Sequence, residues 1–79
     1  MKLPRDLDGD EMAKLLRPFD YEITRQVGSH IRLTTTRNGE HHITIPRHRP
    51  LRIGTLNAIL RDVAQHLDMS RDELLDALL

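Results

Sequence analysis

Five histidines offer the most versatile chemistry in this 79-residue chain, which contains no cysteine. One of them, His30, directly follows Gly28 and Ser29 at the start of a β-rich stretch. An imidazole titrates near pH ~6.5, so it can accept or donate a proton at neutral pH. Cleavage of RNA through the ribose 2′-hydroxyl needs a base for that proton and an acid for the leaving oxygen. His30 suits either role without a metal, although a histidine beside a turn is also typical of an ordinary surface residue.

Arginines surround this histidine in the sequence. Arg25 and Arg32 flank it, and a guanidinium offers a phosphate group a fixed charge and a bidentate pair of donors. The segment 24–61 contains seven arginines against one acid, whereas four basic and six acidic residues precede it, and one basic and five acidic residues follow it. This distribution favours a phosphate-facing surface in a chain of zero net charge, with scattered solvated arginines as the alternative. Gly28 is expected to let a substrate or a neighbouring strand approach without a Cβ in the way.

The adjacent His41 and His42 raise the question of a metal site. Neighbouring residues in a strand point to opposite faces, so these two histidines are poorly placed to bind one ion. His30 and His42 share a face in the strand register favoured below, so these two residues could in principle bind one metal ion together. With no cysteine and only one acid in this segment, no structural zinc and no cofactor are expected.

The elements that must position these residues follow from the periodicity of the apolar residues. After a lead of residues 1–7, Asp8 and Glu11 have capping-box spacing and begin a helix expected over 8–18, which Pro18 ends. The period changes to two over 20–46, which predicts a sheet of three short strands.

Two further helices are expected in the last third of the chain. The first covers 54–67 and has the clearest apolar stripe, and the second is a short helix over 70–79 that begins with a capping box of Ser70 and Glu73. This last helix has enough leucines to contact a second chain as well as the core, so a homodimer through this helix is a further expectation.

The turn between the second and third strands decides which residues share a face. A two-residue Asn38-Gly39 loop would send the apolar residues of the two strands to opposite faces. A three-residue loop over 37–39, with Gly39 in the left-handed region, instead pairs Leu33 with Ile43 on one face. The polar residues then share the other face: His30, Arg32, Thr34, His42 and Thr44.

The order of helix, three-stranded antiparallel sheet, helix and short C-terminal helix is an α+β fold arranged like a double-stranded RNA-binding domain. One domain over 1–79 is expected for a chain of this length. No segment approaches the ~20 apolar residues of a membrane span, and the N-terminus lacks the apolar run of a signal peptide. A cytoplasmic protein without a membrane partner is therefore expected, in line with the absence of cysteine.

Three motifs resemble the HicA family of small RNA-cleaving toxins, and the resemblance covers residues 11–66. They are Gly28-Ser29-His30, Ile45-Pro46-Arg47-His48, and Gly54-Thr55-Leu56 opening a helix with Ile59 and Leu60. The histidine of the first motif is the catalytic residue in the family and falls on His30. His48 stands where family members often have histidine, so it is a second candidate for proton transfer or phosphate binding. The residues expected to bind RNA phosphates are Arg25, Gly28, Ser29, Arg32, Arg47 and His48.

The resemblance implies a metal-independent endoribonuclease, or mRNA interferase, of a type II toxin-antitoxin pair. Its substrate would be mRNA, and a HicB-like antitoxin would cover the polar face around His30. Family members are generally basic, whereas this chain is neutral overall. The alternative is a non-catalytic double-stranded RNA-binding or protein-interaction module with the same fold. Phe19 and Tyr21 are the only aromatic residues, so a stacking platform for single-stranded bases is not expected.

Overall fold

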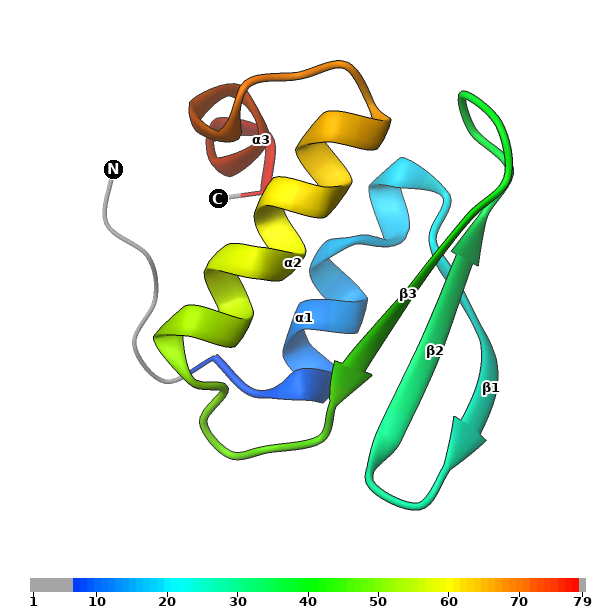
Figure 1. Cartoon of the computed structure of the whole chain (residues 1–79), viewed down its shortest axis with the longest axis vertical. Helices are drawn as coiled ribbons and strands as arrows, with labels where there is room; N and C mark the ends of the chain where they lie inside the picture. Colours follow the sequence, from blue (N-terminus) through cyan, green and yellow to red (C-terminus); the bar gives the residue numbers. More distant parts are fainter. Residues whose placement is uncertain (1–6, 79) are drawn as a thin grey trace.

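The computed structural model describes residues 7–78 as an α+β fold with helices on one side of a sheet (Figure 1). This order confirms the expected fold and its likeness to double-stranded RNA-binding domains. The expected lead over 1–7 lies outside the described residues except for Leu7, and so does Leu79 at the expected end of the last helix. The elements in chain order are α1 (Gly9–Leu15), the 3₁₀ helix η1 (Arg17–Phe19), β1 (Glu22–Val27), β2 (His30–Thr35), β3 (His41–Pro46), α2 (Ile53–His66) and α3 (Arg71–Leu78).

The first helix starts where the sequence predicts and ends earlier. The Asp8 carboxylate accepts from the backbone N–H of Glu11 at 2.8 Å, and the Glu11 carboxylate accepts from the N–H of Asp8 at 3.1 Å. This capping box confirms the expected start. The expected end at residue 18 is wrong, because α1 ends at Leu15 and η1 contains Pro18. Proline has no N–H to bond back to the carbonyl of Lys14, but it fits the first turn of a new helix.

The strands form one antiparallel sheet in the order β1-β2-β3. Leu33 lies opposite Ile43, which confirms the register predicted from the three-residue loop. Gly39 has φ +99°, in line with its expected left-handed conformation, and Asn38 is also left-handed at +59°. The apolar residues of β2 and β3 therefore face one side of the sheet, and the polar residues face the other.

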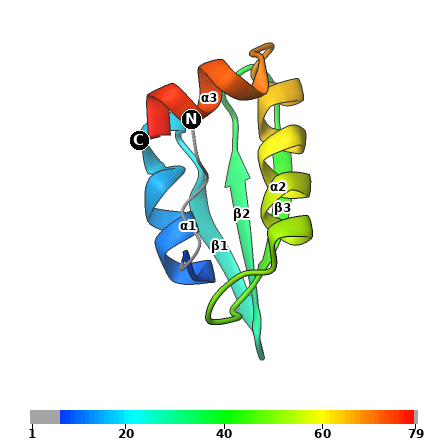
Figure 2. The same cartoon turned by 90° about the vertical axis from the view of Figure 1, so that its left-hand side faces the viewer.

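Helices α1 and α2 cover the apolar face of the sheet, and α3 lies across one end of this helical layer (Figures 1 and 2). The bounds of α2 and α3 match the expected helices to within one residue at each described end. No helix within residues 7–78 has the length and apolar character needed to cross a membrane. The largest fully buried side chains are Tyr21, Met12, Leu16, Ile31, Leu33, Ile45, Leu56, Leu60, Leu74, Leu75, Val63 and Thr35.

The short helix α3 begins with the second expected capping box. The Ser70 hydroxyl accepts from the N–H of Glu73 at 3.0 Å, and the Glu73 carboxylate accepts from the N–H of Ser70 at 3.0 Å. Leu74 and Leu75 are almost fully buried within this chain's own core. These two leucines are therefore not on the surface that a homodimer through α3 would use.

Candidate functional site

His30 is the first residue of β2 and directly follows the turn that joins it to β1. It lies opposite Val27 of β1 and Pro46 of β3, and it is exposed. The turn requires Gly28 at φ +57°, a conformation that residues with a Cβ adopt at a cost. A Cβ on Gly28 would meet nothing within 4 Å, so the expected close approach of a neighbouring strand at this glycine is wrong. The glycine shapes the turn that brings His30 to a corner of the sheet.

Two arginines lie beside His30 on the polar face of the sheet. Arg25 of β1 is directly opposite Arg32 of β2, and both residues are exposed. Like charges directly opposite each other on neighbouring strands are destabilising. Neither guanidinium forms an ion pair with a carboxylate of residues 7–78. An anion bound between Arg25 and Arg32 would relieve this repulsion, and the pair is therefore a candidate phosphate site.

The far end of the same face holds a chain of hydrogen bonds. The hydroxyl groups of Thr24 and Thr34 lie 2.8 Å apart, and Thr34 Oγ1 is 2.7 Å from His42 Nδ1. His42 Nε2 is 3.3 Å from a carboxylate oxygen of Glu40. Because His42 lies opposite Thr34, four residues along β2 from His30, the two histidines are separated by about 13 Å along the strand. The expectation that His30 and His42 could bind one metal ion is therefore wrong.

The segment after β3 runs beside the turn at Ser29. The backbone N–H of Arg47 donates to the carbonyl oxygen of Ser29 at 2.6 Å. Its guanidinium donates to a carboxylate oxygen of Asp10 at 3.2 Å, so this expected phosphate ligand already has an anionic partner. His48 is the next residue and is exposed. The structure thus brings His48 to the same end of the sheet as His30.

A second histidine cluster, which the sequence analysis missed, lies at the opposite end of the sheet. The Tyr21 hydroxyl is 2.8 Å from His41 Nδ1, and His41 Nε2 is 3.2 Å from a carboxylate oxygen of Asp62. The ring of His66 stacks on that of His41 with centroids 4.2 Å apart. Burial, and to a lesser extent the charge of Asp62, raise the pKa of Tyr21 to about 12, so its hydroxyl stays protonated near neutral pH. These residues come from separate parts of the chain, and their contacts hold the sheet to α2.

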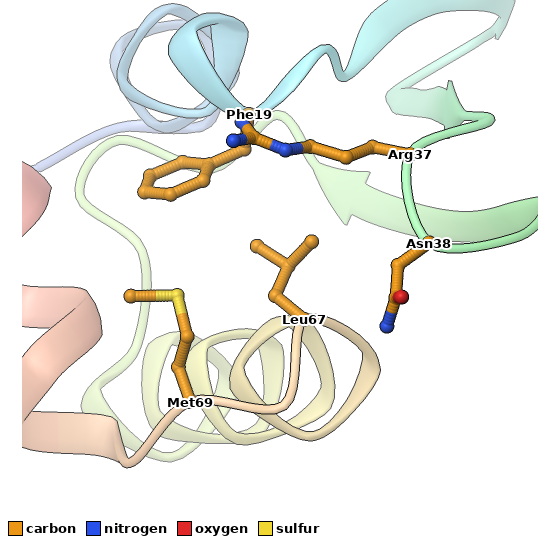
Figure 3. A pocket seen from close by; sticks show the side chains of 5 residues that line it. All are labelled: Phe19, Arg37, Asn38, Leu67 and Met69. Atoms are coloured by element: carbon orange, nitrogen blue, oxygen red, sulfur yellow. The ribbon is translucent and has the colours of Figure 1, made fainter.

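A hollow of about 230 Å³ at this same end carries no acid-base pair (Figure 3). Its lining comprises Phe19, Arg37, Asn38, Leu67 and Met69. The guanidinium carbon of Arg37 lies 5.8 Å from the centroid of the Phe19 ring, and its Nη1 donates to the carbonyl oxygen of Pro18 at 3.2 Å. Figure 3 shows Phe19 of η1 facing Leu67 and Met69, which follow the end of α2. The hollow offers packing surface and no group for proton transfer.

Four of the seven arginines of segment 24–61 lie in three different places. Arg25 and Arg32 share the polar face, Arg47 turns toward α1, and Arg37 lies at the far end of the sheet. Of the positive charge concentrated in this segment of the sequence, the pair Arg25 and Arg32 therefore lies together beside His30.

The comparison with known proteins identifies a family. The family described as HicA toxin of bacterial toxin-antitoxin matches residues 9–64, a span that includes His30, His48 and the whole sheet. No curated protein and no solved structure matches the chain. Toxins of such systems are paired with an antitoxin, so an antitoxin partner follows from the match. The matched span exceeds half of the chain and contains the elements that place His30 beside its two arginines, and the chain therefore belongs to the HicA toxin family of bacterial toxin-antitoxin systems.

Proposed function

We propose that the chain is an endoribonuclease, an mRNA interferase, with His30 as its catalytic residue. The observation that carries the proposal is the position of His30 beside Arg25 and Arg32 on one exposed face. Residues two apart on one face of a strand are separated by about 7 Å, so a phosphate bound by Arg32 lies within reach of the imidazole. A strand holds these side chains more rigidly than a loop would, which favours a fixed reaction geometry.

The proposed reaction needs two proton transfers and no metal. His30 takes the proton of the ribose 2′-hydroxyl, the 2′-oxygen bonds to phosphorus, and the bond from phosphorus to the 5′-oxygen breaks. The departing 5′-oxygen takes a proton from a second group, for which His48 is the candidate. The products are a 2′,3′-cyclic phosphate and a 5′-hydroxyl. Arg25 and Arg32 stabilise the negative charge that develops on the phosphate oxygens.

The turn and the segment after β3 complete the proposed phosphate-binding surface. The open space above Gly28 leaves its backbone accessible to a phosphate, and Ser29 offers a hydroxyl beside it. Arg47 would exchange Asp10 for a phosphate, which slightly lowers its net contribution to binding because an existing, partly exposed ion pair must break.

The proposal extends to the partners of the chain. The substrate is mRNA, the place of action is the cytoplasm, and the antitoxin is HicB-like. A homodimer through α3 has less support, because Leu74 and Leu75 are buried inside the chain. The alternative function, a non-catalytic RNA-binding or protein-interaction module, differs from the proposal in one measurable property, which is turnover.

The test compares purified wild type with His30→Ala on a structured RNA in the presence of EDTA, with analysis of the 3′ ends. His42→Ala is the matched control, since His42 is an exposed histidine on the same face, about 13 Å along the strand from His30. Wild type and His42→Ala are expected to produce cyclic phosphate ends. His30→Ala is expected to cleave at least about 100-fold more slowly, the usual minimum for loss of a general acid or base.

Three results would count against parts of the proposal. Unchanged cleavage by His30→Ala would refute this residue as the catalyst. Loss of wild-type cleavage in EDTA would refute the metal-independent route. RNA binding by the wild type without any cleavage would favour the non-catalytic module.

A further inference from the structure

Strand β1 is unusually exposed for part of a packed sheet. All six of its residues are exposed. Ile23 lies opposite the fully buried Leu33 and so faces the helical layer, yet it remains 52% exposed. Val27, opposite His30 on the polar face, is 57% exposed. Within residues 7–78, the one other large hydrophobic residue with comparable exposure is Ile53 at 49%.

The position of β1 in the sheet adds to this exposure. β1 pairs with β2 alone, so its other side is a free edge. A free edge presents backbone N–H and C=O groups that can pair with a strand of another chain. Natural edge strands are commonly blunted by proline, by short length or by a covering element, and β1 has six residues, no proline and no helix that buries it. The protective features present are a bulge between Ile23 and Arg25 and the exposed charged side chains of Glu22 and Arg25.

A positively charged hollow of about 340 Å³ lies between α1 and β1. Ile23 and Ala13 supply apolar surface to its lining. The charged residues of the lining are Lys14, Arg17 and Arg47 against Asp10, which leaves a net charge of +2. The hollow thus combines an uncovered apolar side chain with an excess of positive charge, beside a strand edge that can form backbone hydrogen bonds.

We propose that β1 is the docking edge for the antitoxin. An extended acidic segment of the antitoxin adds to the sheet beside β1, inserts an apolar side chain next to Ile23 and places carboxylates near Lys14 and Arg17. Such β-strand addition obtains affinity from main-chain hydrogen bonds and specificity from side-chain pockets. This inference rests on the pairing of the family with an antitoxin and does not depend on ribonuclease activity.

The geometry also connects docking to the proposed catalytic surface. Val27 lies directly opposite His30, so a strand added to β1 would lie two strand spacings, or about 10 Å, from His30. Side chains of the added strand that point to the polar face would flank His30 and Arg25. The antitoxin would thereby obstruct RNA on the polar face while its other contacts lie near Lys14 of α1 and Arg17 of η1.

Calorimetry with the cognate antitoxin, purified as the probe, tests the docking edge. Ile23→Glu and Lys14→Glu are each expected to raise the dissociation constant at least about tenfold, because they remove apolar contact or reverse the complementary charge. Ile53→Glu is the matched control, since it places the same charge at a comparably exposed residue of α2, and its affinity should equal that of the wild type. Equal affinities of all three variants would overturn the proposal.

Amide hydrogen exchange on the wild-type complex gives a second test that needs no variant. The amides of β1 that point away from β2 should become protected when the antitoxin binds. Unchanged exchange at these amides would overturn strand addition, and so would protection by a structured RNA but not by the antitoxin. Neither measurement uses RNA cleavage. A negative result in either test would therefore overturn the docking edge without affecting the proposed catalytic role of His30.

Discussion

His30 and His41 have different environments in this chain. His30 is exposed beside two arginines, whereas His41 is 19% exposed and hydrogen-bonded to Tyr21 and near Asp62. The second environment fixes the ring and leaves little room for a substrate. The first is exposed to solvent, and such an environment is expected of a group that exchanges protons with a ligand.

The Tyr21 cluster predicts a loss of stability at high pH. The pKa of Tyr21 is raised from 10 to about 12 in the folded chain, so the folded state favours the protonated hydroxyl. The resulting stabilisation is complete below pH 10 and decreases as the pH rises from 10 toward about 12. Urea unfolding at several pH values should show this decrease, and its difference from Tyr21→Phe isolates the tyrosine from other groups that titrate there. Tyr21 is the only tyrosine, so tyrosinate absorbance reports its ionisation directly. Ionisation of the folded protein near pH 10 would contradict the prediction.

His48 is expected to act after His30 in the same reaction. If it protonates the leaving oxygen, His48→Ala should lower kcat by about 100-fold or more, with little change in KM. A higher KM at unchanged kcat would instead assign His48 to phosphate binding. The measurement is steady-state cleavage of a short RNA, and a 5′-leaving group of low pKa should restore much of the lost rate only if His48 is the acid.

At the scale of elements, the approach of α1 to the end of β3 decides where the corner of the sheet with His30 lies. Gly9, the first residue of α1, packs so closely that a Cβ there would be 2.5 Å from the carbonyl oxygen of Pro46 and 3.0 Å from the Cα of Arg47. Pro46 in turn lies opposite His30. The helix therefore supports the strand end on which the proposed site depends.

Replacing this glycine should destabilise the fold. Gly9→Ala forces α1 away from backbone atoms, and such overpacking typically costs about 1–3 kcal/mol. Gly54→Ala is the matched control near the start of α2, because a Cβ there meets nothing within 4 Å and alanine favours a helix by up to about 1 kcal/mol. Chemical unfolding should show a lower free energy of unfolding for Gly9→Ala and an equal or higher one for Gly54→Ala. Equal stability of the two variants would contradict the close packing.

The elements that the sequence predicts well are those determined by local signals. Capping boxes at Asp8 and Ser70 locate two helix starts, and the alternation of apolar residues selects the register of β2 and β3. The end of α1 is harder to predict from the sequence. Pro18 is compatible both with the end of a helix and with the start of a 3₁₀ helix such as η1. Leu16 lies in the core and Phe19 packs against it, and these contacts are not indicated by the local sequence.

At the scale of the whole molecule, the parts of the site that the sequence does not predict are long-range. Arg47 pairs with Asp10, a contact between residues 37 positions apart, and nothing near either residue indicates the partner. The contact of Tyr21 with His41 spans 20 positions in the same way. The position of His30 is predictable because a turn and the two-residue period of the strand determine it. The ion pair of Arg47 with Asp10 instead depends on how α1 packs on the sheet.

The whole molecule has zero formal net charge, so the proposed binding of RNA requires a local arrangement of positive charge. If Arg25 and Arg32 bind one phosphate between them, replacing both with Gln in a His30→Ala background should reduce the slope of log K against log salt by about 0.7 for single-stranded RNA. Arg61→Gln removes an exposed arginine of α2 and should leave the slope unchanged. A fluorescence-anisotropy titration at several salt concentrations measures both, and an unchanged slope in the double variant would exclude this pair as the phosphate site.

The same two arginines should oppose stability in the free protein. Like charges on facing residues cost about 0.2–1 kcal/mol, so Arg25→Gln should raise the free energy of unfolding measured in urea at low salt. High salt screens this repulsion and should reduce the gain, whereas Arg61→Gln, which removes no facing charge, should show neither effect. Arg25→Gln would then stabilise the fold and weaken RNA binding. This combination would mean that the bound anion neutralises a positive charge that has no partner on this face in the free chain. A loss of stability in Arg25→Gln would instead assign the arginine to packing on the edge strand and remove the electrostatic argument for the site.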